Sequence, residues 1–215
     1  MNIVSIKIPV NEYKRGIKAA RESIAAIKEI ESNITAWGTE DSTREKLGTQ
    51  GVEKRAAELL KLEQQRAEAE RSALATLNEI RAAAVEYIEK QTDPDGADIT
   101  GDNAADFALI ANGLITTPAK LERILAKHDN VAFRTAAAEY AKARSWDGFS
   151  SYENAPAVSD MTTQIFDGLN NSVQNTSGIA AIQYTDTPGE YARIAGEYGL
   201  TAEFNESGGA SLADF

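Results

Sequence analysis

The longest uninterrupted helical pattern in the sequence covers residues 51–91. Some forty residues pass there without an internal proline or glycine, between Gly51 and the Asp93-Pro94 pair. At 1.5 Å per residue this helix would be about 60 Å long, nearly twice what a small compact domain needs. The sequence therefore predicts an extended molecule. One face of the helix carries Leu59, Leu62, Ala69, Ala73, Leu77, Ile80, Ala84 and Ile88.

A second helix is predicted over residues 11–32, where apolar side chains recur at intervals of three and four. An exposed apolar stripe needs a cover, and we expect residues 51–91 to provide it in an intramolecular hairpin. The intervening residues 33–51 are rich in turn formers and charges, so they are predicted to be a connection whose only large anchor is Trp37. The stripe consists of Tyr13, Ile17, Ala20, Ile24, Ile27 and either Ile30 or Ile34.

A self-associating coiled coil is the alternative for the long helix. Leu59 and Leu62 suit the seam of such a structure. Arg66 and Thr76 fall on the same register, and alanine fills much of the middle, so the heptad pattern is only partly met. The hairpin is therefore the preferred prediction.

The first ten residues predict a strand or arm. Within residues 3–8 the apolar side chains alternate with polar ones, and Pro9 then closes the run. Such a strand must add to a sheet formed later in the chain or in another subunit, because its backbone groups otherwise stay unpaired. Residues 178–186 are the later candidate. The apolar side chains of the predicted N-terminal strand are Val4, Ile6 and Ile8.

A module of three short helices is predicted within residues 92–144. Thr117 is a plausible N-cap, Pro118 suits the first helical position, and Asn130 can cap the following helix. The apolar positions of the three helices are Phe107, Leu109, Ile110, Leu121, Ile124, Leu125, Val131, Phe133, Ala137, Tyr140 and Ala141.

The last two helices of this module allow an alternative function, a DNA-binding helix-turn-helix over residues 118–144. Six basic and three acidic side chains between 117 and 144 give a net charge of only +3, and DNA binding rests on several clustered phosphate contacts. The second helix opens Val131, Ala132 and Phe133 and offers Arg134 alone to base edges. Nucleic acid is therefore not the expected partner.

Residues 145–215 form an acidic C-terminal region of mixed helix and strand. Ten acidic residues and one basic residue give this region a net charge of −9, out of −11 for the whole chain. Residues 145–160 are predicted to be a linker with docked aromatics, after which Ser159 can cap a helix. The run from Thr187 to Glu190 resembles a capping box that opens another helix. Such an acidic surface should repel nucleic acid and anionic membranes.

No catalytic signature is present, so the sequence does not predict an enzyme or a cofactor. Cysteine is absent, His128 is the only histidine, and neither a nucleophile motif nor a phosphate-binding glycine loop occurs. Residues 93–102 fit a calcium loop poorly, since Gln91 would fall at the first ligand position and an Asp–Gly-rich turn needs no ion. No stretch approaches 18 apolar residues, and we expect a soluble protein made in the cytoplasm.

The short-helix module also carries a resemblance to a known class of proteins. Its motifs and their order are similar to those of small acidic helical proteins encoded beside the capsid genes of tailed bacteriophages. In order, these motifs are Thr-Pro-X-X-Leu-X-X-Ile, Lys-His-X-Asn, Phe-X-Arg and Glu-Tyr-Ala. The resemblance covers residues 50–144 and departs in the C-terminal third, since scaffolds often end in a basic helical hook. Here the motif residues are Thr117, Pro118, Leu121, Ile124, Lys127, His128, Asn130, Phe133, Arg134, Glu139, Tyr140 and Ala141.

That resemblance implies a non-enzymatic structural or assembly protein of a phage particle, found in the host cytoplasm and then in the virion. We expect it to act through protein–protein contacts with capsid or other virion proteins and with copies of itself, and not with membrane. The chain divides into residues 1–10 (arm), 11–91 (hairpin), 92–144 (module) and 145–215 (acidic region). The side chains predicted to bind partners are Val4, Ile6, Ile8, Ile17, Ile24, Ile27, Trp37, Phe133, Tyr140 and Trp146.

Overall fold

A computed structural model describes residues 5–93, 99–128, 130–149, 154–187 and 189–214. The fold is mainly helical, as predicted, with 79% of the residues in helices and no strand within these ranges, so the predicted small β contribution is wrong. The helices are α1 (Val10–Ala36), α2 (Glu40–Thr92), α3 (Ala104–Ala111), α4 (Pro118–Lys127), α5 (Val131–Ala143), α6 (Ala155–Gln174), α7 (Ile179–Thr185), α8 (Glu190–Glu197), α9 (Thr201–Glu206) and the 3-10 helix η2 (Gly209–Asp214).

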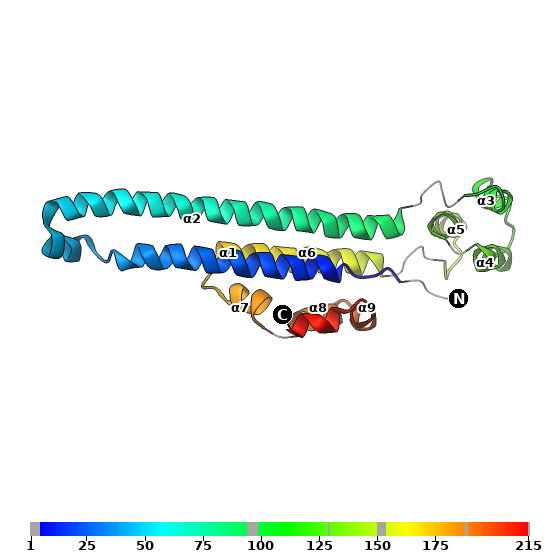
Figure 1. Ribbon diagram of the computed structural model, residues 1–215. Coiled ribbons are helices and arrows are strands. Elements are labelled where there is room, and N and C mark those ends of the chain that lie inside the picture. Colours follow the sequence, from blue (N-terminus) through cyan, green and yellow to red (C-terminus); the bar gives the residue numbers. More distant parts are fainter. Residues whose placement is uncertain (1–4, 94–98, 129, 150–153, 188, 215) are drawn as a thin grey trace.

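Helices α1 and α2 form the predicted hairpin, which sets the length of the molecule (Figure 1). The predicted connection over 33–51 is wrong, because only Trp37–Thr39 separates the two helices. Thr39 caps α2 by accepting a hydrogen bond from the Ser42 amide at 3.2 Å, and acidic residues in the first turn favour this start. Gly48, with φ at +66°, then bends the chain into the long straight part of α2.

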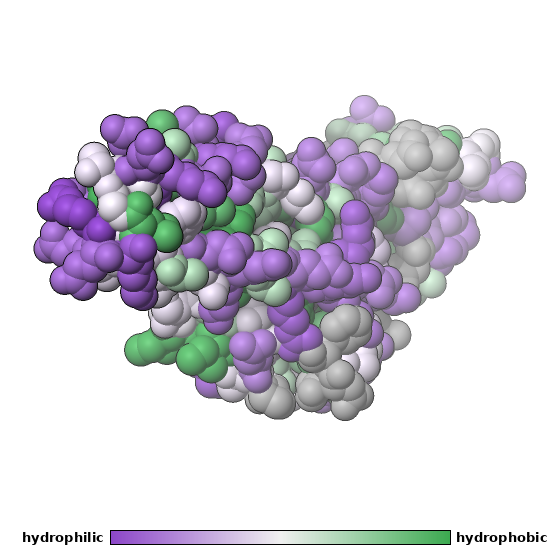
Figure 2. All heavy atoms as spheres, turned by 60° about the vertical axis from the view of Figure 1, so that its left-hand side comes forward, coloured by the Kyte–Doolittle hydropathy of each residue, from purple (hydrophilic) through white to green (hydrophobic). Residues whose placement is uncertain are grey.

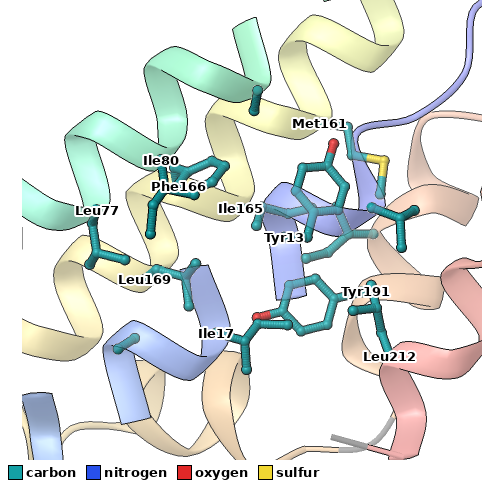
Figure 3. Close-up of a cluster of buried hydrophobic side chains, with 14 of the residues drawn as sticks. Tyr13, Ile17, Leu77, Ile80, Met161, Ile165, Phe166, Leu169, Tyr191 and Leu212 are labelled. Carbon is teal, nitrogen blue, oxygen red and sulfur yellow. The ribbon is translucent and has the colours of Figure 1, made fainter. Parts of the chain in front are cut away.

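Helix α6 lies along the half of the hairpin nearest the N-terminus, and α7, α8, α9 and η2 cover the opposite side of α1 from α2 (Figure 1). We call this layered part the body. Its core is a single hydrophobic cluster to which α1, α2, α6 and the C-terminal helices all contribute. The central residues in Figure 3 are Tyr13, Ile17, Leu77, Ile80, Met161, Ile165, Phe166, Leu169, Tyr191 and Leu212.

Residues 5–9 run extended beside the body without joining a sheet. Side-chain amides take the place of a neighbouring strand. The Asn154 side chain accepts from the Ile6 amide at 2.9 Å and donates to the Ile6 carbonyl at 3.1 Å. Gln91 does the same for Lys7, at 2.7 and 3.0 Å. Paired backbone groups need no β partner, and this explains why the alternating pattern did not lead to a strand.

The second predicted strand, residues 178–186, is wrong because this segment forms α7. Its apolar residues also have helical spacing, and Ala181 and Thr185, four residues apart, are buried on the side facing the body. Gly168 of α6 allows the close approach, since a Cβ added there would lie 2.2 Å from the Tyr184 ring. The Ser172 hydroxyl of α6 donates to the carbonyl of Ala180 at 2.9 Å.

Two predicted caps in the C-terminal region are also wrong. Ser159 lies inside α6, which begins four residues earlier at Ala155. The capping box before α8 does not form, because the Thr187 hydroxyl donates to the Ile182 carbonyl at 3.0 Å and the Glu190 carboxylate bonds to side chains. Residue 188 lies outside the described residues.

Helices α3, α4 and α5 form the predicted short-helix module beyond the end of α2, around a separate hydrophobic cluster (Figure 1). The predicted cap at Asn130 is confirmed, whereas Thr117 holds the N-cap position without a side-chain cap hydrogen bond. Thr117 precedes Pro118 at the start of α4, and the Asn130 side chain accepts from the Phe133 amide at 3.0 Å. Trp146 and Phe149 from the following segment pack against this second cluster, as the linker prediction proposed.

The module is fastened by one carboxylate that receives two hydrogen bonds. Asp106 of α3 lies 2.7 Å from both the Lys127 ammonium and the His128 Nε2 at the end of α4. The hydrogen bonds from Lys127 and His128 lower the pKa of Asp106, against a smaller opposing effect of desolvation. A carboxyl with a lowered folded pKa stabilises the fold above its unfolded pKa of about 3.9.

We therefore expect the module to lose stability as the pH falls from about 4 through the lowered pKa of Asp106. Urea unfolding at pH 6 and pH 3 measures this, with Trp146 as the fluorescent reporter in a Trp37→Phe background. Asp106→Asn should be less stable than the parent at pH 6 and should approach it at pH 3. An equal difference at both pH values would contradict the role of this carboxylate.

Candidate protein-contact surfaces

Most side chains predicted to bind partners are used inside the molecule. The hypothesis that they contact other proteins is corrected for these residues, because helices of the same chain cover them. The hydrophobic cluster of the body takes up Ile6, Ile8, Ile17, Ile24 and Ile27, and that of the module takes up Phe133. Val4 lies outside the described residues.

The three remaining aromatics are half-buried. Trp37 ends α1 at the tip of the hairpin. Tyr140 donates a hydrogen bond to the Ile115 carbonyl, and the Trp146 ring meets Tyr140 edge to face at 5.8 Å between centroids. The Arg144 guanidinium stacks over the Tyr140 ring at 4.3 Å. Tyr140 and Trp146 therefore close the module, and Trp37 keeps a partly open face.

Helix α7 exposes two large apolar side chains close together. Ile179 is 81% exposed and Ile182 60% exposed, and their spacing of three residues places them on one face of the helix. We call these two residues the isoleucine pair. In Figure 2, apolar side chains stand out at the lower edge of the molecule, on the side that carries α7. Large apolar groups that gather at the surface mark contact sites more often than scattered single ones do.

Polar bonds on both sides hold α7 rigidly on the body. The Thr176 hydroxyl, just before the helix, bonds to the Glu31 carboxylate of α1 at 3.0 Å. The Arg21 guanidinium of α1 donates to the Thr185 carbonyl at the end of the helix. Because both anchors lie on α1, α7 runs along that helix with a fixed face toward solvent. The isoleucine pair is thus displayed by a supported helix.

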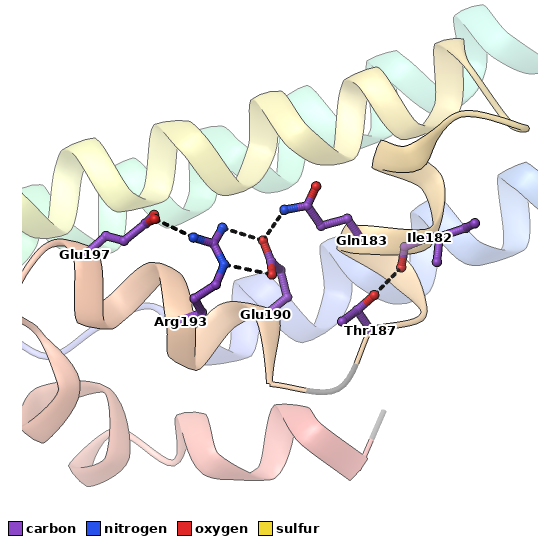
Figure 4. A network of polar contacts seen from close by, with 6 residues as sticks. All are labelled: Ile182, Gln183, Thr187, Glu190, Arg193 and Glu197. Carbon is purple, nitrogen blue, oxygen red and sulfur yellow. Dashed lines mark hydrogen bonds and ion pairs between the residues drawn. The ribbon is translucent and has the colours of Figure 1, made fainter.

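A second polar network joins α7 to α8 (Figure 4). The Glu190 carboxylate accepts from Gln183 and from both sides of the Arg193 guanidinium, at 2.7 and 3.0 Å, and Arg193 also pairs with Glu197. The hydrogen bonds from Arg193 are the largest cause of a lowered pKa at Glu190, which is 6% exposed. The only base of residues 145–215 is therefore engaged within the chain.

The hairpin extends beyond the body as a two-helix projection. Glu31 marks the boundary, since its carboxylate bonds both to Arg66 of α2 at 2.8 Å and to Thr176 at 3.0 Å. Residues 32–65 lie beyond this junction, and from here on the arm means these residues and not the N-terminal residues 1–10. Among the residues that the structure describes, those of α1 and α2 and the short turn between them make up this part (Figure 1). Two leucines of the arm are exposed to solvent, Leu47 by 61% and Leu60 by 58% of their surface.

The basic side chains of α4 and α5 are partly committed to the module. Lys127 pairs with Asp106, and the Arg144 guanidinium donates to the Gly113 carbonyl at 3.0 Å. Lys120, Arg123 and Lys142 are exposed. The segment that contains them, residues 117–144, has a net charge of only +3, which is small for binding to the phosphates of nucleic acid.

The predicted calcium loop falls largely on residues 94–98, outside the described residues. Within the described part of the chain, no three acidic or histidine side chains gather as a metal site would require. None of the described helices is both long and apolar enough to cross a bilayer.

The isoleucine pair was not predicted from the sequence, because residues 178–186 were assigned to a strand. Ile179 and Ile182 would point to opposite faces in a strand but share a face in a helix. The signal for a helix was available in the three-residue spacing of the two isoleucines and in the alanines between them.

Comparison of the chain with protein-family models, curated proteins and solved structures gives no match.

Proposed function

We propose that this chain is a non-enzymatic structural or assembly protein that acts through protein–protein contacts. The observation that carries the proposal is the isoleucine pair, two large apolar side chains displayed on a helix that is anchored at both ends. Removing such side chains from water by contact with another protein gives about 1.5–3 kcal/mol each. A helix fixed to the body loses little conformational freedom on binding, so most of this gain is retained.

Several fully buried polar side chains bond to other parts of the chain, which supports a structural role for them. The Tyr13 hydroxyl meets the Thr162 hydroxyl at 2.8 Å between α1 and α6, and burial raises the pKa of Tyr13. The Asn154 and Ser172 side chains bond backbone groups of other segments. Each of these bonds ties two elements of the body together.

The tailed-phage particle is the setting that we propose for these contacts. The support is the resemblance of Thr117–Ala141 to small acidic helical proteins encoded beside phage capsid genes. The partners would be capsid or other virion proteins, met in the host cytoplasm during assembly. Mass spectrometry of purified particles and of assembly intermediates tests this setting directly.

Replacing the isoleucine pair by serine, Ile179→Ser with Ile182→Ser, should leave the free energy of unfolding within about 0.5 kcal/mol, because both side chains are exposed. We expect the variant to be depleted at least tenfold from particles or assembly intermediates, measured by quantitative mass spectrometry. Leu114→Ser is the matched control, since Leu114 is 60% exposed, like Ile182, but lies outside the body.

Two outcomes would contradict the proposal. One is equal recovery of the parent and the isoleucine variant in particles. The other is retardation of duplex DNA at physiological salt that is lost in Arg134→Ala, which would favour the helix-turn-helix alternative.

A further inference from the structure

The arm lacks a core of its own. Within residues 32–65 the only buried residues are Thr43 and Gly51, so none of the large apolar side chains of the arm is fully covered. In the body, by contrast, α1 and α2 bury a continuous row from Tyr13 to Ile27 and from Ala73 to Ile88. Two helices alone cannot enclose a core, because each covers only one side of the other. The half-buried apolar side chains of the arm are Ile34, Trp37, Val52, Leu59 and Leu62.

With Leu47, Leu60 is one of the two exposed large apolar side chains of the arm, and it lies in the straight part of α2. It is 58% exposed and points away from the seam on which Leu59 and Leu62 are half-buried. Of the positions one turn before and after it on the same face, Ala56, Ala57 and Gln64 carry no charge and Glu63 does. A second helix can therefore contact Leu60 between small and uncharged neighbours and leave the exposed Glu63 carboxylate at the edge of the contact, in water.

The charge distribution indicates what covers the arm. The arm carries five basic and six acidic side chains, a net charge of −1, and the chain as a whole carries −11, which leaves −10 outside the arm. The regions of two chains that lie outside the arms therefore repel each other, whereas two arms with interspersed charges of both signs do not. A second copy of the chain can thus approach the arm, and the favoured approach keeps the two bodies at opposite ends.

We propose that two copies pair antiparallel through their arms and form a four-helix bundle with Leu60 near its centre. A two-fold axis through the bundle presents the same face of each arm to the other. Residues 49–65 give a face about 25 Å long and about 20 Å wide, or about 1,000 Å² in total, at the lower end for a specific interface. The dimer is therefore reversible. This inference rests on the proposed function, for which it names the self-association surface.

Sedimentation velocity of the full-length chain between 1 and 200 µM tests the pairing, at about 0.15 M and about 0.5 M salt. We expect a monomer–dimer equilibrium that persists at high salt, because screening weakens the repulsion between the bodies and leaves the apolar contact intact. Leu60→Glu should weaken dimerisation at least tenfold with unchanged helix content by circular dichroism. Ile182→Glu, at a similarly exposed position of the body, should dimerise like the parent.

A second measurement uses the absence of cysteine from the chain. Under mild oxidation, an equimolar mixture of Ala56→Cys and Gln64→Cys chains should form a disulfide-linked dimer, because antiparallel pairing about Leu60 places these two positions opposite each other, and Ala192→Cys, exposed on α8, should not. A parent chain that stays monomeric throughout, or a dimer lost in Ile182→Glu and kept in Leu60→Glu, would overturn the arm pairing. The proposed function would survive either result if the chain is still found in particles, and it would fail independently if a dimeric chain is absent from them.

Discussion

Replacing Phe166 by alanine is expected to lower the free energy of unfolding by about 3–5 kcal/mol, the usual cost of removing a buried phenylalanine ring. Phe166 is fully buried where α1, α2 and α6 meet, and its ring lies edge-on to Tyr13 with 6.3 Å between centroids (Figure 3). The helices around it are anchored elsewhere in the body, so they cannot collapse into the space that alanine leaves. Urea unfolding followed by far-ultraviolet circular dichroism measures the loss.

Two controls make this result specific to packing. Phe166→Leu keeps most of the buried volume and should cost clearly less than alanine. Leu60→Ala removes an apolar side chain of similar kind from an exposed position and should change stability by less than about 1 kcal/mol. If alanine and leucine at position 166 are equally tolerated, the core described around α6 is not tightly packed.

Asn154→Ala is expected to lower the free energy of unfolding by about 2–4 kcal/mol. The change removes both hydrogen bonds to Ile6, a residue 2% exposed, so an amide and a carbonyl become buried without partners. Each unpaired buried polar group costs about 1–3 kcal/mol. Chemical denaturation gives the magnitude, and amide hydrogen exchange of residues 6–10 should rise together with it.

Gln91→Ala supplies the matched comparison for Asn154→Ala. Gln91 makes the same pair of bonds to the neighbouring residue Lys7, but this residue is exposed, so water can replace the lost partner. We expect a cost below about 1 kcal/mol. Equal effects of the two substitutions would mean that the two buried hydrogen bonds between Asn154 and Ile6 do not hold the N-terminal segment in place.

The helical hairpin could be predicted from the sequence because its signals are local and repeated. Apolar side chains recur at threes and fours from Tyr13 to Ile27, and no proline or glycine interrupts residues 52–91. The caps at Thr117 and Asn130 could be placed for the same reason, since the side chain that ends or begins a helix lies within one turn of it. These inferences needed no knowledge of distant contacts.

The N-terminal segment could not be predicted, because its backbone partners are remote in sequence. Asn154 follows Ile6 by 148 residues, and Gln91 follows Lys7 by 84. An alternating pattern shows that backbone groups must be paired, but it does not show that side-chain amides will pair them. Helix α7 is a different case, because its three-residue spacing lies in the sequence itself, and the contacts with Ser172 and Gly168 show only where this helix packs.

The start of α2 was misplaced for a different reason. Gly48 and Gly51 suggested a break in the helix, and one of them does bend the chain. The N-cap at Thr39 nevertheless starts a helix earlier, since a short helical segment before the bend can pack on the end of α1. The candidate surface at the isoleucine pair was missed only because α7 was assigned the wrong period.

The junction at Glu31, Arg66 and Thr176 has a consequence for how far the molecule reaches. The core of the body lies entirely on one side of this junction. Matched deletions of one turn from both helices of the projection would therefore shorten the projection by about 5.4 Å per turn and leave the core unchanged. The hairpin tip is in this sense a spacer of adjustable length. Evolution or an engineer could tune the separation of whatever is attached at its two ends, turn by turn.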